Sequence, residues 1–181
     1  MNHDHYDDAY IRDILSAHKS FAMVGASPNI VRPSYFALKY LMQKGFRVIP
    51  VNPTHAGKTL LGETIVGSLK DLEEPVDIVD VFRNAKEAIP ITEDAIEIGA
   101  KVVWMQLGVR NDEAAKIAEA AGLKVVMNRC PKIEYGRLSG EIGWAGVNTR
   151  TISNRRPRLA KGFQHRVIGG GRTRRRPVAQ D

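Results

Sequence analysis

Short apolar runs rich in β-branched residues alternate with segments of helical periodicity between residues 20 and 127. Runs of this kind, bounded by polar or glycine-containing segments, are typical of strands buried in a sheet. They predict five strands, at 21–24, 46–51, 76–82, 101–105 and 123–127. Because helical segments separate the runs, the pattern predicts an α/β domain.

Start and stop signals place helices between the predicted strands. Pro33 occupies a first helical position and Gly45 supplies the stop, a second helix ends at Gly99, and Asn111 caps a third that ends before Gly122. Strands joined through helices run parallel, so we predict a doubly wound parallel sheet of about five strands between two helical layers. Ligands of such sheets bind beyond the carboxyl ends of the strands, at the switch point.

Composition and charge divide the chain into parts. The 181 residues are 43% hydrophobic and 26% charged, which is typical of one globular domain. The net charge of +7 is concentrated at the C-terminus: residues 150–181 hold ten Lys and Arg and one Asp, which leaves 17 basic and 19 acidic residues in 1–149. We therefore predict a partly helical lead-in at 1–14, a ligand-binding domain at 15–150 and a basic, disordered tail at 151–181.

The cysteine, the histidines, the apolar runs and the N-terminal residues indicate the cellular compartment and whether a metal site is expected. A single cysteine, Cys130, excludes an intramolecular disulfide, and no apolar run approaches the ~20 residues of a membrane span. The N-terminus is acidic where a secretory signal is basic, so we predict a cytoplasmic protein. The five histidines are scattered, with only His3 and His5 close together, and predict no metal site.

The loop after the first predicted strand carries candidate ligand-binding chemistry. Gly25 allows close approach of a ligand to the backbone, Ser27 offers a hydroxyl, and the following helix start adds N–H groups and the charge of Arg32. This pattern suits a phosphate group. A tight strand-to-helix turn with a surface arginine explains the same residues equally well.

A dinucleotide is the first ligand to consider for such a loop. Sites for NAD use the pattern G-x-G-x-x-G and an acidic residue at the end of the second strand. After Gly25 the loop contains no further glycine, and the second strand ends in Val51-Asn52-Pro53 without a carboxylate. The sequence therefore disfavours an NAD site, and a nicotinamide-dependent oxidoreductase remains as an alternative.

At this point the chain resembles the small stand-alone CoA-binding proteins, whose Rossmann-like domain is similar to the N-terminal domain of the succinyl-CoA synthetase α subunit. The resemblance covers residues 15–159 and rests on five ordered segments, which are VGASP at 24–28 with RPSY at 32–35, VNP at 51–53, VDVFR at 79–83, WMQLGV at 104–109 and NRCPK at 128–132. It implies that the cofactor is coenzyme A or an acyl-CoA, with its phosphates on the first glycine loop.

The resemblance also implies roles for individual residues. The diphosphate would contact Gly25, Ala26, Ser27, Arg32 and Ser34. The nucleotide and the strand-end rim would involve Asn52, Pro53, Lys58, Phe82, Arg83, Gln106 and Gly108. For the strand-end residues the alternative is a buried sheet position or a solvated arginine.

Catalysis receives little support from the sequence. No nucleophile elbow, P-loop or zinc-protease motif is present, and the resemblance implies no ligase activity for a chain of this length. Cys130 lies between Arg129 and Lys132, where cations would lower the pKa of a thiol, whereas a small residue buried under a loop would be inert. We predict a CoA-binding protein without chemistry of its own; a nucleic-acid-binding module that acts through the basic tail is a further alternative.

Overall fold

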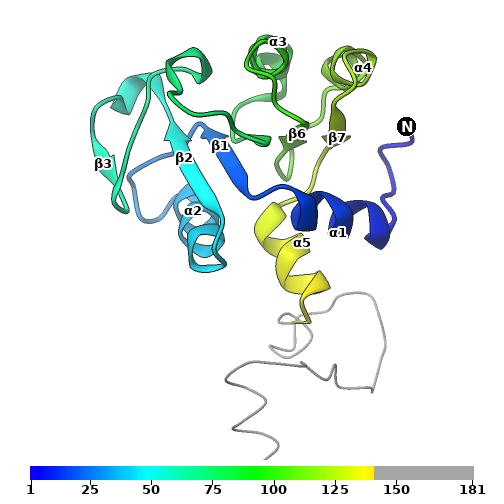
Figure 1. Cartoon of the computed structure of the whole chain (residues 1–181), viewed down its shortest axis with the longest axis horizontal. Helices are drawn as coiled ribbons and strands as arrows, with labels where there is room; N and C mark the ends of the chain where they lie inside the picture. The colour runs from blue at the N-terminus through cyan, green and yellow to red at the C-terminus, as the bar shows by residue number, and fades with distance from the viewer. Residues whose placement is uncertain (141–181) are drawn as a thin grey trace, which may run out of the picture.

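A computed structural model of the chain describes residues 1–140 (Figure 1). The predicted basic tail at 151–181 and the last ten residues of the predicted domain lie outside the described residues. The described elements are α1 (Asp8–Ala17), β1 (Ser20–Val24), α2 (Pro33–Gln43), β2 (Arg47–Val51), η1 (Pro53–His55), β3 (Thr59–Leu60), β4 (Glu63–Thr64), η2 (Leu69–Asp71), β5 (Ile78–Val81), η3 (Ala85–Glu87), α3 (Ala88–Glu97), β6 (Val102–Met105), α4 (Asp112–Ala120), β7 (Lys124–Val126) and α5 (Pro131–Leu138).

The five predicted strands form one parallel sheet in the order β2-β1-β5-β6-β7. The chain passes from β1 to β2 at one edge of the sheet and then crosses over to β5, which pairs with β1 on its other side. The switch point therefore lies between the carboxyl ends of β1 and β5, where Val24 is in register with Val81. The predicted doubly wound α/β fold is confirmed. A two-stranded hairpin, β3-β4, lies outside the main sheet and is too short to leave a periodic signal.

Helices cover both faces of the sheet (Figure 1). Helices α1, α2 and α5 cover one face, and α3 and α4 cover the other. Alternate residues of each strand point to opposite faces: Met23 and Trp104 pack beneath α1, α2 and α5, whereas Ala22 and Met105 pack beneath α3 and α4. Since both faces are covered, the strands are apolar throughout, as expected for a parallel sheet.

The predicted helix boundaries follow local chemistry. Pro33 opens α2, and the Asn111 side chain accepts hydrogen bonds from the backbone N–H groups of Glu113 and Ala114 at the start of α4. Gly99 and Gly122 follow α3 and α4 with φ of +75° and +85°.

Helix α1 crosses the boundary predicted between residues 14 and 15. Its residues Ile11, Ile14 and Leu15 are buried in the core on the α2 side of the sheet. Just before it, the Tyr6 hydroxyl accepts a hydrogen bond of 2.7 Å from the Met127 N–H, and burial raises the pKa of Tyr6 to about 12. The first residues thus pack on the end of β7, together with the core of the domain.

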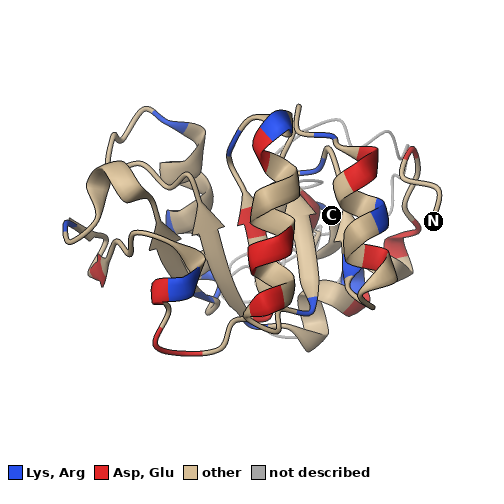
Figure 2. Cartoon of the chain, turned by 90° about the horizontal axis from the view of Figure 1, so that it is seen from above, with Lys and Arg blue, Asp and Glu red and all other residues tan. Residues whose placement is uncertain are grey.

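Charge is nearly balanced over the described part of the chain, with 17 Lys and Arg and 18 Asp and Glu in residues 1–140. Acidic residues follow one another along α3 (Figure 2), where Lys70 pairs with Asp94 and Glu97. The excess of positive charge therefore belongs to residues beyond Gly140.

Candidate functional site

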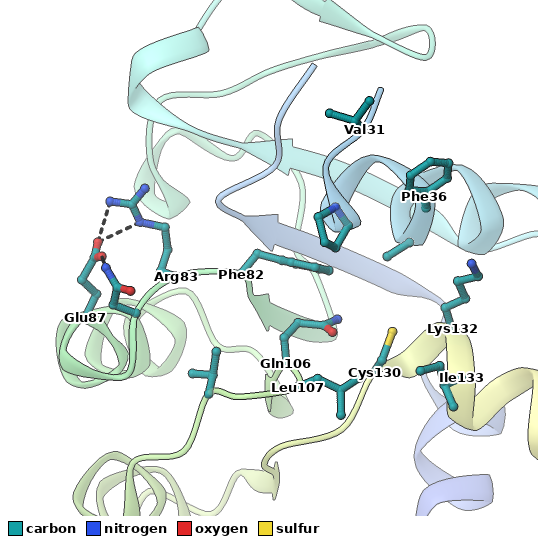
Figure 3. Close-up of a pocket in the computed structure, with 14 residues that line it drawn as sticks. Val31, Phe36, Phe82, Arg83, Glu87, Gln106, Leu107, Cys130, Lys132 and Ile133 are labelled. Carbon is teal, nitrogen blue, oxygen red and sulfur yellow. Dashed lines mark hydrogen bonds and ion pairs between the residues drawn. The ribbon is translucent and has the colours of Figure 1, made fainter. Parts of the chain in front are cut away.

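A cavity of about 700 Å³ lies at the carboxyl ends of β5 and β6, between the starts of α2 and α5 (Figure 3). Its apolar walls are Val31, Pro33, Phe36, Ala37, Phe82, Leu107, Val109 and Ile133. Its polar lining is Arg83, Asn84, Glu87, Gln106, Cys130 and Lys132. The cavity occupies the strand-end rim beside the switch point.

Three of the predicted site residues, Phe82, Arg83 and Gln106, line this cavity. Phe82 and Gln106 directly follow the last residues of β5 and β6, and Arg83 follows Phe82, so the switch-point rule could identify all three. The other predicted residues lie on neighbouring loops, in η1 or at the start of α2, and do not contribute to the cavity lining.

Gly25 joins the first loop to the end of β5. Its φ is +92°, its N–H donates to the Val51 carbonyl, and a Cβ at this position would lie 2.6 Å from the Phe82 carbonyl oxygen. The same Cβ would lie 2.9 Å from Cδ of Arg83. Glycine is therefore required by the protein's own backbone, and the loop rests directly against the Arg83 side of the cavity.

The β1–α2 loop satisfies part of its own hydrogen-bonding capacity. The Ser27 N–H donates to Oγ of Ser34, and the Asn29 N–H donates to Oγ of Ser27, both at 3.2 Å. Within residues 1–140, the N–H groups of Ala26, Ile30 and Ser34 have no hydrogen-bond partner; Ala26 and Ser34 are buried, whereas Ile30 is exposed. The loop thus leaves two buried N–H groups and one exposed N–H group for an acceptor such as a phosphate oxygen.

Arg32 precedes α2 and is exposed. Its guanidinium makes no ion pair with any described residue. Arg32 is therefore a cation near the start of α2 that an anion could use.

Asn52, Pro53 and Lys58 lie on the far side of the same loop. The Asn52 side chain donates a 2.7 Å hydrogen bond to the Ala26 carbonyl and accepts one from the Thr54 N–H, so it ties β2 to the β1–α2 loop. Pro53 opens the 3-10 turn η1, and Lys58 is exposed just before β3. None of the three lines the cavity.

Gly108 lies beside the cavity rather than in its wall. It is exposed with φ of +81°, and its N–H donates to Oδ1 of Asn128 at 2.8 Å. This bond connects the β6 and β7 ends, while the neighbours of Gly108, Leu107 and Val109, face the cavity.

Arg83 shares the cavity with a carboxylate. Its Nε donates to Oε2 of Glu87 at 2.8 Å, and a second guanidinium nitrogen lies 2.7 Å from the same oxygen (Figure 3). The hydrogen bond from Arg83 lowers the pKa of Glu87. The sequence pattern identified Arg83 but not the anion that compensates it.

Cys130 lines the cavity as the residue before α5. Burial raises the pKa of its thiol, and the nearby Asp80 carboxyl acts in the same direction; the backbone N–H groups of α5 and Lys132 only partly oppose them. Lys132 does lower this pKa, but desolvation outweighs it, so the structure favours the buried, inert cysteine over the reactive one.

Beneath the cavity lies an acid that sequence reasoning did not select. Asp80 is fully buried on β5, and Nε2 of Gln106 donates to its two carboxyl oxygens at 3.0 and 3.2 Å. Burial raises the pKa of Asp80 to about 8, and the Gln106 hydrogen bond only partly opposes this shift. An acid inside an otherwise apolar run is the one sequence signal that could have identified it.

Apolar side chains surround the cavity mouth with unusual exposure. Val31 is 72% exposed, Leu107 56% and Phe36 50%, and all three line the cavity (Figure 3). Clustered exposure of this kind is typical of a binding surface.

Residues 1–140 contain neither a candidate metal site nor a candidate membrane-spanning helix. No His, Cys, Asp and Glu side chains there form a group of three or more that could hold a metal ion. The same residues contain no helix with the length and apolar character needed to cross a bilayer.

A parallel doubly wound sheet with a largely apolar cavity at its switch point defines the class of α/β proteins that bind ligands at the carboxyl ends of their strands. The family model described as "CoA binding domain" matches residues 19–136. The chain belongs to this CoA-binding domain family, and the resemblance noted from the sequence is confirmed.

Three similar proteins match most of the length of this chain. The Bacillus subtilis protein YneT, described as uncharacterized, is 37% identical over 127 residues, which are 70% of this chain and 93% of that protein. A hypothetical protein from Pyrococcus horikoshii has a solved structure with a TM-score of 0.71 and 41% identity, covering 75% of this chain and 94% of that one. A Thermus thermophilus structure matches with a TM-score of 0.70 and 40% identity, covering 74% and 99% of the two chains.

Proposed function

We propose that this protein binds coenzyme A or an acyl-CoA without chemistry of its own. The diphosphate lies at the β1–α2 loop, near Gly25, Ala26, Ser27, Arg32 and Ser34, and the pantetheine arm enters the cavity. The observation that carries the proposal is the position of an apolar cavity at the switch point directly beside that loop.

The chemistry of coenzyme A matches the two halves of this site. One end of the ligand is a phosphorylated nucleotide, which favours free N–H groups and cations. The unpartnered N–H groups of Ala26 and Ser34 and the side chain of Arg32 provide these. The other end is an uncharged arm with a sulfur atom, which suits apolar walls such as Phe36 and Phe82.

The absence of catalysis is part of the proposal and rests on the cavity lining. Its thiol, Cys130, has a pKa that burial raises, so the thiolate is disfavoured. None of the histidines in residues 1–140 lines the cavity to act as its base. The single cysteine also supports the cytoplasmic location that we propose for the protein.

A thermal scan with two ligands tests the proposal. A ligand at 100 times its Kd stabilises the folded state by about 2.7 kcal/mol, so CoA should raise the Tm measurably and NAD should not. Equal shifts with CoA and NAD would favour the nicotinamide-dependent alternative instead.

A pair of exposed apolar residues tests where the ligand binds. Phe36 lines the cavity, whereas Leu61, in the β3-β4 hairpin, is 37% exposed and does not. Phe36→Ala should weaken CoA binding about tenfold by calorimetry, because it removes apolar contact area, and Leu61→Ala should leave Kd within about twofold. The same loss in both variants would place the ligand elsewhere.

A further inference from the structure

We propose, on the basis of the CoA binding proposed above, that Asp80 is a positioning residue for the ligand's uncharged arm. It does not touch the ligand, but holds the Gln106 amide at the cavity floor and favours binding when its carboxyl is protonated. The juxtaposition of a buried acid, an amide and an apolar cavity supports this role.

The sheet register fixes Asp80 directly under the cavity. Asp80 pairs with Met23 of β1 on one side and with Trp104 of β6 on the other, and all three face α2 and α5. The side chain is 0% exposed. Among residues 1–140, no Lys, Arg or His lies within ion-pair distance of its carboxyl group.

Gln106 connects this acid to the cavity. Its Nε2 donates at 3.0 and 3.2 Å to the two oxygens of Asp80, which fixes the plane of the amide, while the side chain forms part of the cavity wall (Figure 3). Either carboxyl oxygen can accept the Nε2 proton, so the bond is available in both protonation states. The Oε1 atom is then free to accept an N–H group of the pantetheine arm.

Few other titratable groups face this floor. The start of α5 contributes the Cys130 thiol and the Lys132 ammonium group. Helix α2 contributes only Pro33, Phe36 and Ala37 to the cavity, and β1 and β6 flank Asp80 with uncharged side chains. The loop after β5 adds the Arg83 guanidinium and the Glu87 carboxylate, which pair with each other. Ionisation of Asp80 would therefore add a negative charge that no ion pair compensates among residues 1–140.

The sign of the resulting pH dependence follows from linkage. CoA is a polyanion, so its binding near an ionised Asp80 is opposed by repulsion, and the bound ligand raises the pKa of Asp80 further. Burial already raises that pKa to about 8. Affinity for CoA is therefore full below pH 8 and decreases as the pH rises through this value, by at most tenfold per pH unit.

Calorimetry on the full chain measures this dependence. The ligand is S-methyl-CoA, whose sulfur cannot ionise, and Kd is compared at about pH 7 and about pH 9. We expect the wild-type Kd to rise by more than about threefold and at most about tenfold, the Kd of Asp80→Asn to change less than about twofold, and Asp13→Asn, an exposed control on α1, to behave as wild type.

The outcomes separate this inference from the proposed function. Wild type without affinity at either pH overturns both. Binding that is independent of pH in wild type, or equally pH-dependent in Asp80→Asn, overturns only the role of Asp80.

If Asp80→Asn does not fold, the carboxyl carbon of Asp80 is titrated by NMR in the wild-type protein. Its pKa should rise when S-methyl-CoA binds. An unchanged titration overturns the inference without the variant.

Discussion

The guanidinium group of Arg83 lies 2.7 Å from Oε2 of Glu87 at the edge of the cavity. Both side chains line the cavity, and the carboxylate takes up guanidinium N–H donors that Arg83 could otherwise offer to a phosphate. It also places a negative charge next to a polyanionic ligand. In the complex that we propose, the pair would therefore limit the contribution of Arg83 to CoA binding.

Removing that charge should tighten binding. We expect Glu87→Gln to lower the Kd for CoA about twofold to tenfold by calorimetry, because Arg83 is released and repulsion is removed. Stability should change by less than about 1 kcal/mol, since the pair is exposed. Glu93→Gln removes an equal charge from the exposed side of the following helix and should leave Kd unchanged; a matching gain there would show that only net charge matters.

Gly25 is expected to be intolerant of any side chain for a reason internal to the protein. An alanine Cβ would meet the Phe82 carbonyl oxygen at 2.6 Å in addition to the cost of φ at +92°. Gly122 has φ of +85° with no atom within 4 Å of its hypothetical Cβ, so Gly122→Ala measures the conformational cost alone.

Chemical denaturation should therefore rank the two variants. Gly122→Ala should cost about 1–2 kcal/mol of unfolding free energy. Gly25→Ala should cost about 1–3 kcal/mol more, because a backbone contact must shift. Equal losses would show that the loop moves away from β5 without cost.

The sequence predicted the elements that carry local signals. The five strands, the start of α2 at Pro33 and the Asn111 cap follow from periodicity and capping chemistry, and strand-end residues such as Phe82 and Gln106 follow from the switch-point rule.

Other parts of the site depend on contacts between distant segments. Asp80 lies within the predicted strand at 76–82, and its pairing with Gln106 requires the β5–β6 register. Phe36 and Lys132 reach the cavity from two helices whose packing no local pattern encodes. Lys58 follows only from the family resemblance and lies before the unpredicted β3-β4 hairpin.

The pKa of Asp80 should also be visible in stability. An aspartate titrates near 3.9 when unfolded and about 8 in this fold, so the protonated carboxyl stabilises the folded state fully below pH 4. That contribution is lost as the pH rises from about 4 to about 8, and above pH 8 this group causes no further change in the unfolding free energy.

Comparison with Asp80→Asn isolates this contribution. The unfolding free energy of wild type should fall by a few kcal/mol relative to the variant between about pH 4 and about pH 8, in urea titrations at each pH. Other groups titrate alike in the two proteins, so their contributions cancel in the difference between the two unfolding free energies. A constant difference across this range would mean that Asp80 ionises in the folded protein as it does in water.

The basic C-terminal segment should be separable from CoA binding. Residues 151–181 hold nine Lys and Arg against Asp181, whereas residues 1–150 hold 18 basic and 19 acidic residues. A near-neutral domain gives polyanions little long-range attraction. Deletion of 151–181 should therefore leave the Kd for CoA and the Tm nearly unchanged and abolish any binding to DNA.

Filter binding of DNA at several salt concentrations tests this division of the chain. If the nine cations of 151–181 contact phosphates, the slope of log K against log salt for the full chain should approach about −8, because each neutralised phosphate contributes about −0.9. The truncated chain should show no binding. DNA affinity retained after truncation would assign the contact to the domain, and a loss of CoA affinity would mean that the basic segment takes part in holding the ligand, where its cations would suit the 3′-phosphate.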